Sequence, residues 1–182
     1  MFRALGVFAI AVCVAACAQL PRMPQGGFQP GGFDMAGRFS VRFQNELSTG
    51  HVQWRHQPLS DDLLITNPLG QGVARITRKA DAVELSTADG NSQTAPDAES
   101  LTERVLGWQL PLEGLPEWIQ GRVREGFPAE TIRDDSQKLI ELRQQGWRIT
   151  YEAYQGDRPS RLQLSRPGLE LRMVVESFTN SP

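Results

Sequence analysis

The chain has 182 residues, and its 19 Lys and Arg against 21 Asp and Glu give a formal net charge of −2. This balance argues against nucleic-acid binding through a basic surface. The only two cysteines, Cys13 and Cys17, both lie near the N-terminus, so the rest of the chain cannot form a disulfide.

The N-terminal segment has the features of a secretory signal peptide. Arg3 precedes an apolar run over 4–16 that is too short to span a bilayer as a helix. The run ends in Val14-Ala15-Ala16-Cys17, which resembles the lipobox of bacterial lipoproteins. That resemblance implies cleavage before Cys17, diacylglycerol on its sulfur and an acyl group, such as palmitate, on its new N-terminus. An ordinary signal peptide or an uncleaved anchor is the alternative.

The second residue after the predicted cleavage site is Ala18. In the sorting rule that accompanies the lipobox, Asp at this place retains a lipoprotein at the inner membrane. Ala18 therefore implies delivery to the outer membrane. Removal of residues 1–16 leaves enough chain for one domain with a sizeable core.

Residues 17–36 are predicted to be a lipidated, flexible tether, because 19–36 are rich in Pro, Gly and Gln. A single domain over 37–182 follows, in which apolar and polar residues alternate as in strands. Turn residues separate the alternating runs at short intervals, which favours an antiparallel meander. About ten or eleven strands are expected, and that many in one sheet would curl into a barrel or part of one.

Residues 97–121 interrupt the alternation with two predicted short helices. Asp97 can cap the first, which would end at Gly107, and Pro116 can start the second. The apolar face of the first helix consists of Leu101, Val105 and Leu106. On a curved sheet, such an insert either fills the concave side as core or covers a cavity.

No catalytic or metal-binding pattern is evident in the sequence. His51 and His56 should point to opposite faces of a strand and are interpreted as solvated polar residues. Asp61-Asp62 could be an acid–base pair, but it opens a strand after a Pro-containing turn and is interpreted as turn chemistry. Gly70-Gln71-Gly72 lacks the third glycine and the following helix of a dinucleotide-binding loop. We therefore expect no metal, no cofactor and no enzymatic activity.

The large apolar residues are the better candidates for a binding site. The chain has four tryptophans, and each one by itself is more often part of a core than a ligand contact. As a set on a curled sheet beneath short helices, they suit the wall of a cavity for acyl chains. The predicted lining consists of Trp54, Leu101, Val105, Trp108, Trp118, Ile119 and Trp147.

The segment 65–72, ITNPLGQG, has the composition of a tight turn with a leucine, Leu69, in its middle. A turn tip lies in water, where a large apolar side chain contributes nothing to the fold. Either Leu69 folds back onto the core, or the tip contacts an apolar partner.

Taken in order, these motifs resemble the LolB family, outer-membrane receptors that accept lipoproteins from a periplasmic carrier. The resemblance runs from about Gly37 to Val175, and its most specific stretch is 63–70. The matching motifs are Gly37-Arg38-Phe39, Trp54, Leu63-Leu64-Ile65-Thr66-Asn67-Pro68-Leu69-Gly70, Asp97-Ala98-Glu99-Ser100-Leu101, Leu106-Gly107-Trp108, Leu110-Pro111-Leu112, Leu115-Pro116-Glu117-Trp118-Ile119-Gln120-Gly121, Gln145-Gly146-Trp147 and Tyr151.

The resemblance implies a mainly β fold: an open antiparallel half-barrel of about eleven strands, with short helices over a concave hydrophobic cavity. It implies a LolA-like carrier, acylated lipoproteins as cargo and outer-membrane lipid as partners, with Pro68, Leu69 and Gly70 as a membrane-insertion loop. We expect a monomer at the periplasmic face of the outer membrane, anchored through Cys17. The alternative is a structural or lipid-scavenging outer-membrane lipoprotein without a carrier partner.

Two features depart from the family pattern. Members often have an amphipathic helix before the first strand, whereas this chain has a Gly- and Pro-rich segment there. Phe178 stands near the end of the last predicted strand, where a tryptophan is usual.

Overall fold

The computed structural model describes residues 31–80 and 82–180. The predicted signal peptide, the lipidation site Cys17 and most of the predicted tether lie outside the described residues. None of the helices within the described ranges is long and apolar enough to cross a membrane.

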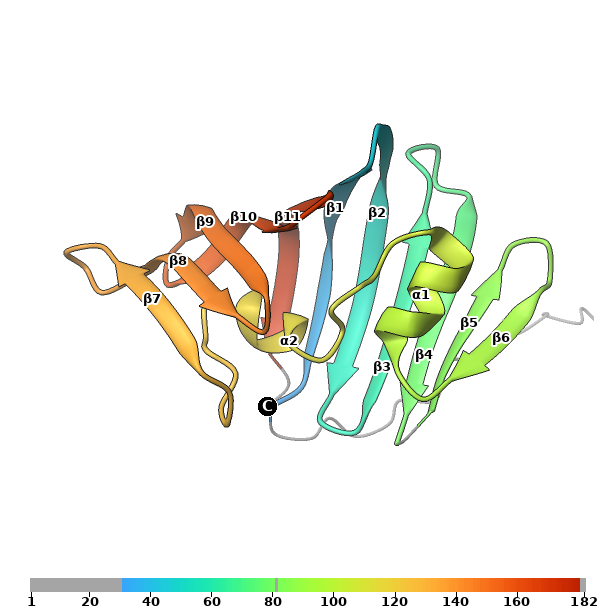
Figure 1. Cartoon of the computed structure of the whole chain (residues 1–182), viewed down its shortest axis with the longest axis horizontal. Helices are drawn as coiled ribbons and strands as arrows, with labels where there is room; N and C mark the ends of the chain where they lie inside the picture. The colour runs from blue at the N-terminus through green and yellow to red at the C-terminus, as the bar shows by residue number, and fades with distance from the viewer. Residues whose placement is uncertain (1–30, 81, 181–182) are drawn as a thin grey trace, which may run out of the picture.

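Within the described residues, eleven strands form one antiparallel sheet in the order β6-β5-β4-β3-β2-β1-β11-β10-β9-β8-β7. The chain's first and last strands, β1 and β11, are therefore neighbours in the middle of the sheet (Figure 1). The strands are β1 Phe33–Phe43, β2 Glu46–Gln57, β3 Ser60–Thr66, β4 Gly72–Lys79, β5 Ala82–Thr87, β6 Ser92–Ala95, β7 Ala129–Arg133, β8 Leu139–Gln144, β9 Trp147–Gln155, β10 Arg158–Arg166 and β11 Leu169–Asn180.

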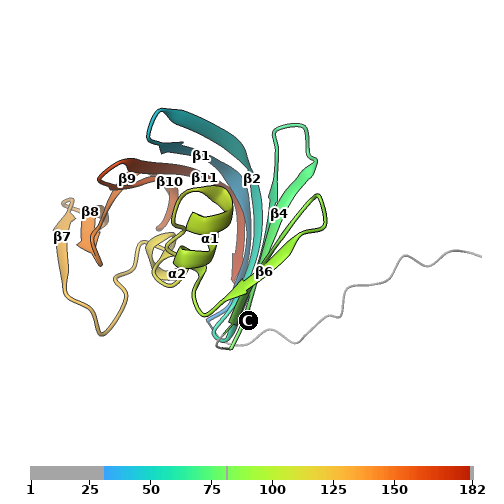
Figure 2. The ribbon, with the colours of Figure 1, turned by 45° about the vertical axis from the view of Figure 1, so that its right-hand side comes forward.

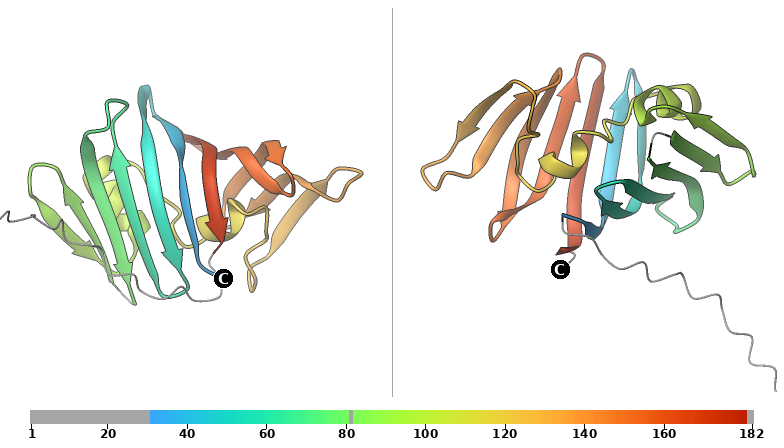
Figure 3. Two further views of the ribbon diagram at one scale, coloured as in Figure 1. Left: turned by 180° about the vertical axis from the view of Figure 1, so that it is seen from behind. Right: turned by 90° about the horizontal axis from the view of Figure 1, so that it is seen from below.

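The sheet is strongly curved but open. Its two edge strands, β6 and β7, each pair with a single neighbour in the described part of the chain. Figure 2 shows the sheet curling around a concave side that holds both helices. The left view of Figure 3 shows the same sheet from behind, with both helices on the far side of the strands. The predicted open antiparallel half-barrel is confirmed.

Strand β1 begins at Phe33, four residues before the predicted start of the domain at Gly37. Phe33 pairs with His56 of β2, and Met35 pairs with Trp54. Both apolar side chains point into the core and are buried, so their burial stabilises the longer strand. The expectation that the tether reaches residue 36 is therefore wrong for 33–36.

Both predicted helices are present: α1 (Ala98–Leu106) and α2 (Leu115–Trp118). The side chain of Asp97 accepts a hydrogen bond from the Ser100 backbone N–H at 2.7 Å and so caps α1. Gly107 ends the helix with φ 83°, in the left-handed region that favours glycine. These two caps fix where α1 starts and stops on the concave side of the sheet.

The connection between the helices, residues 107–114, is fastened to α1. The Thr102 hydroxyl is fully buried, donates to the Ala98 carbonyl at 2.8 Å and accepts from the Leu110 N–H at 2.9 Å. Leu110 and Leu112 are buried against the sheet. Helix α1 and the start of this connection therefore form one unit over the concave face.

Candidate functional site

An apolar cavity of about 30 Å³ lies between the sheet and the connection that follows α1. It is lined by the apolar side chains of Phe39, Val52, Trp54, Leu63, Ile65, Trp108, Leu110, Leu115, Leu171 and Met173. Its volume is close to the share of one water molecule in liquid water, ~30 Å³. The apolar space between the sheet and this connection is thus nearly filled, and an acyl chain fits there only if the helical cover moves.

The seven predicted lining residues divide between this cavity and the packed core. Trp54 and Trp108 line the cavity. Leu101 and Ile119 are fully buried elsewhere in the core. Val105 is half-buried on α1 and packs against the core.

The remaining two candidates, Trp118 and Trp147, form a separate pair with ring centroids 6.5 Å apart. Trp118 donates its indole N–H to Gln144 Oε1 at 2.9 Å, and its backbone carbonyl accepts from the Tyr151 hydroxyl at 3.1 Å. Burial raises the pKa of the Tyr151 phenol, which favours the protonated form that donates this bond. The arrangement is that of a packed core.

The turn between β3 and β4 presents Leu69 to solvent, with 86% of the residue exposed. Asn67 Oδ1 accepts from the N–H groups of Leu69 and Gln71, both at 3.0 Å, and the Asn67 carbonyl accepts from Gly70 N–H at 2.9 Å. Gly70 has φ 84°. The turn satisfies its own backbone groups and projects from the upper end of the sheet in Figure 1. The possibility that Leu69 folds back onto the core is excluded.

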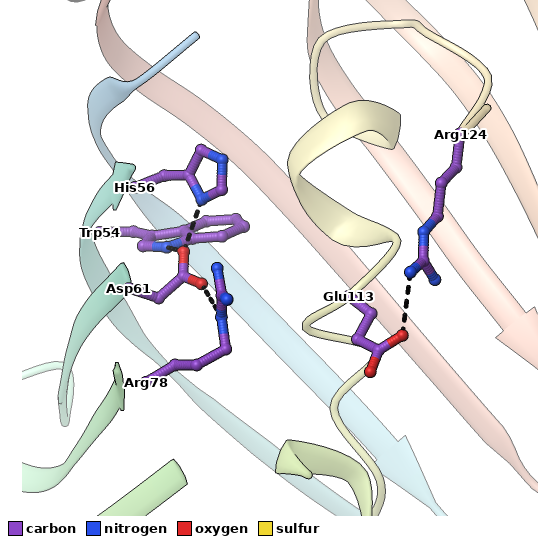
Figure 4. A network of polar contacts seen from close by, with 6 residues as sticks. All are labelled: Trp54, His56, Asp61, Arg78, Glu113 and Arg124. Carbon is purple, nitrogen blue, oxygen red and sulfur yellow. Dashed lines mark hydrogen bonds and ion pairs between the residues drawn. The ribbon is translucent and has the colours of Figure 1, made fainter. Parts of the chain in front are cut away.

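A buried polar network lies at the other end of the same strands (Figure 4). The side chain of Asp61 is completely buried. Its Oδ1 accepts from Trp54 Nε1 at 2.8 Å and lies 2.7 Å from His56 Nδ1, while Oδ2 accepts from Arg78 Nε at 2.6 Å. Such charge-assisted hydrogen bonds are stronger than neutral ones.

Two predictions are therefore wrong here. Asp61 lies at the opening of a strand, as expected, since β3 begins at Ser60, but its carboxylate points inward on the same face as Leu63 and plays no part in the turn. His56 is only 9% exposed and is not solvated. The two histidines do lie on opposite faces, as expected, since Trp54 and His56 share the inward face of β2 while His51 does not. The alternation of inward- and outward-facing residues in β3 could have predicted that Asp61 faces inward with Leu63. The two adjacent carboxylates obscured this alternation.

Residues 31–80 and 82–180 contain no group of three or more His, Cys, Asp or Glu side chains that could hold a metal ion.

A family model described as "Outer membrane lipoprotein LolB" matches residues 32–178. The chain belongs to the LolB family. It is 36% identical to the outer-membrane lipoprotein LolB of Thiobacillus denitrificans over 185 residues, which cover 99% of this chain and 100% of that protein. It is 33% identical to the LolB of Chromobacterium violaceum over 187 residues, covering 98% and 99%. The resemblance identified from the sequence is confirmed.

Solved structures agree with the LolB assignment at the level of the fold. A LolA superfamily protein from Nitrosomonas europaea superimposes with a TM-score of 0.53 at 11% identity, covering 87% of this chain and 90% of that one. A DUF1329 family protein from Desulfovibrio piger gives a TM-score of 0.53 at 7% identity, covering 82% and 85%. At these identities the likeness concerns the half-barrel fold alone.

Proposed function

We propose that this LolB-family protein is an outer-membrane lipoprotein that accepts lipoproteins from a LolA-like periplasmic carrier and inserts them into the outer membrane. The observation that carries the proposal is Leu69, a leucine exposed to 86% on a self-contained turn at one end of an apolar half-barrel. The fold does not need this side chain, so its apolar surface is available to a bilayer.

The acyl chains of the cargo occupy the concave side, in the space where Trp54 and Trp108 line the small cavity. Because that cavity holds only about 30 Å³, α1 and the connection bonded to it through Thr102 move away as a unit when cargo enters. The acyl chains then take the place of the helical cover and contact the apolar side chains of the sheet.

Transfer needs no covalent step, no metal and no cofactor. Burial of each CH₂ group contributes about 0.8 kcal/mol wherever an acyl chain is sheltered. The carrier, this domain and the bilayer therefore offer comparable environments, and a graded preference among them is sufficient for movement. The domain acts as a monomer at the periplasmic face of the outer membrane, and lipid on Cys17 keeps it there.

The Pro68-Leu69-Gly70 tip enters the bilayer and brings the open cavity to the membrane surface. Embedding one leucine side chain is favourable by about 1.5–3 kcal/mol, enough to orient the domain but not to anchor it. A charge at this position would resist entry into hydrocarbon and be repelled by anionic headgroups.

The deciding experiment is Leu69→Glu, measured for stability, for uptake of lipoprotein from the carrier, and for release into liposomes. Because the side chain is exposed, the free energy of unfolding should change by no more than about 0.5 kcal/mol. Uptake should persist and release should fall sharply. Leu69→Met should behave as the parent.

The matched control is Leu59→Glu, which places the same charge on another exposed leucine in the turn at the opposite end of β3. This variant should release lipoprotein normally. Equal release by Leu69→Glu and the parent would exclude the membrane role of the turn. Failure of the parent to take cargo from the carrier would favour a structural or lipid-scavenging lipoprotein.

A further inference from the structure

The inward-facing side chains of β1 to β5 form rows across the sheet, because each strand pairs in register with the next. One row is entirely apolar: Met35, Trp54, Leu63, Ile76 and Leu85. The next row, farther from the Leu69 turn, changes character: Phe33, His56, Asp61, Arg78 and Val83. Three adjacent polar residues, His56, Asp61 and Arg78, here called the charged row, thus follow directly on an apolar surface.

The charged row and the apolar row are joined by one hydrogen bond. Trp54 borders the apolar cavity with its ring, and its indole N–H donates to Asp61 Oδ1 at 2.8 Å. Asp61 is in turn held by Arg78 at 2.6 Å and His56 at 2.7 Å. The Trp54 ring is therefore fixed in place where the apolar lining ends.

Beyond the charged row the concave side contains a second, larger cavity of about 1050 Å³. His56 and Arg78 form part of its wall, and charged side chains from the segment around α2 form another part. Among these, Arg124 Nη2 and Glu113 Oε2 form an ion pair at 3.0 Å, drawn beside the network in Figure 4. Its walls mix these charged side chains with apolar ones such as Val83, Leu112 and Val123, whereas the lining beside Trp54 is apolar throughout.

We propose that the charged row is the floor of the acyl-binding site and sets how much of each acyl chain is buried. A chain that enters from the Leu69 end gains apolar contact as far as Trp54. One that continued past it would remove water from the partly exposed side chains of Arg78 and His56 without offering a hydrogen bond, which is costly. This inference rests on the proposed acyl-binding function and adds a limit on acyl length to it.

The test compares saturated fatty acids of increasing length as competitors for a bound fluorescent fatty acid. The full mature chain is used, with Cys17→Ala in every variant so that its own lipid does not compete. Each added CH₂ should tighten binding by about fourfold, the ratio that corresponds to ~0.8 kcal/mol, until the chain reaches the floor. Longer acids should then show no further gain.

The decisive variant is His56→Phe with Asp61→Leu and Arg78→Met, which makes the charged row apolar. Replacing a whole buried ion cluster by apolar residues of similar volume is often neutral or stabilising. The gain in affinity should continue for several more CH₂ groups, because one row corresponds to two residues, about 7 Å, along a strand. The matched control is Asp62→Leu with Arg75→Met, an ion pair on the convex face of the same two strands, which should leave the limit unchanged.

A second measurement does not depend on the triple variant. In a protein that keeps Trp54 and has Phe at the other three tryptophans, an acid of limiting length with bromine at its last carbon should quench Trp54 more than one brominated near its carboxyl group. If the parent binds fatty acids but the triple variant shows the same limit on acyl length, the charged row is not the floor of the site. Quenching in the reverse order would exclude the floor as well. A parent that binds none of them would instead overturn the acyl-binding function, and the floor with it.

Discussion

Two buried indoles, one on β2 and one on helix α2 against the other half of the sheet, are anchored in different ways. Trp54 of β2 donates to the carboxylate of Asp61, which is paired with Arg78 and lies within hydrogen-bond distance of His56. Trp118 of α2 donates to the neutral amide of Gln144 on β8. Both tryptophans are almost completely buried, but Trp54 lines the small apolar cavity and Trp118 does not.

The partners of Gln144 explain the second arrangement. Its Oε1 accepts from the Arg124 N–H at 3.0 Å, and its Nε2 donates to the Arg124 and Phe127 carbonyls at 2.8 and 3.1 Å. The amide thereby ties Trp118 to the backbone that connects α2 with β7. The hydrogen bond from Trp118 to a neutral amide suits a region that only has to keep its shape. The hydrogen bond from Trp54 to the Asp61 carboxylate also lies at the boundary of an apolar surface.

The largest effect on stability is expected from Asp61→Ala. This change leaves Arg78 partly buried without its carboxylate and should lower the free energy of unfolding by about 3–5 kcal/mol. Denaturant titration followed by circular dichroism measures it. Asp62→Ala, next in sequence but on the convex face, is the control and should cost no more than about 1 kcal/mol, because it breaks an exposed ion pair. Equal losses would show that burial of the carboxylate is unimportant.

A smaller loss is expected from Gln144→Leu, which keeps the approximate size of the side chain but removes the amide. The indole N–H of Trp118 and the backbone N–H of Arg124 then lack their acceptor. An unsatisfied buried donor costs about 1–3 kcal/mol. The same titration measures it, and Gln145→Leu, an exposed neighbour in the β8–β9 turn, should be close to neutral. A neutral Gln144→Leu would mean that water or another group replaces the amide.

The last contrast is read from fluorescence, in proteins that keep one tryptophan and have Phe at the other three. A fatty acid brominated in mid-chain should quench a protein that retains only Trp54 or only Trp108. It should leave one that retains only Trp118 or only Trp147 nearly unchanged, because that pair does not line the cavity. Equal quenching of all four single-tryptophan proteins would mean that the acyl chains spread across the whole concave face. The surroundings of Trp54 and of Trp118 would then not differ in function.

The sequence alone determined the features that depend on local order along the chain. Alternation with short turns predicted an antiparallel sheet of about eleven strands, since side chains alternate between faces with a period of two. Asp97 and Gly107 predicted both ends of α1, since capping is decided within one turn of helix. The resemblance to the LolB family pointed to an exposed Leu69, and the turn around it is closed by its own residues.

Only the tertiary structure decided the features that depend on residues distant in sequence. The register of β2, β3 and β4 brings His56, Asp61 and Arg78 together, and without partners the two carboxylates of 61–62 resembled a turn. Residues 33–36, predicted to belong to the tether, form part of β1 because they pair with β2 on one side and β11 on the other. How much of the concave side is filled, and which tryptophans border the remaining space, also depend on packing across elements. Close packing is a property of the assembled layers and leaves no periodic pattern in any one of them.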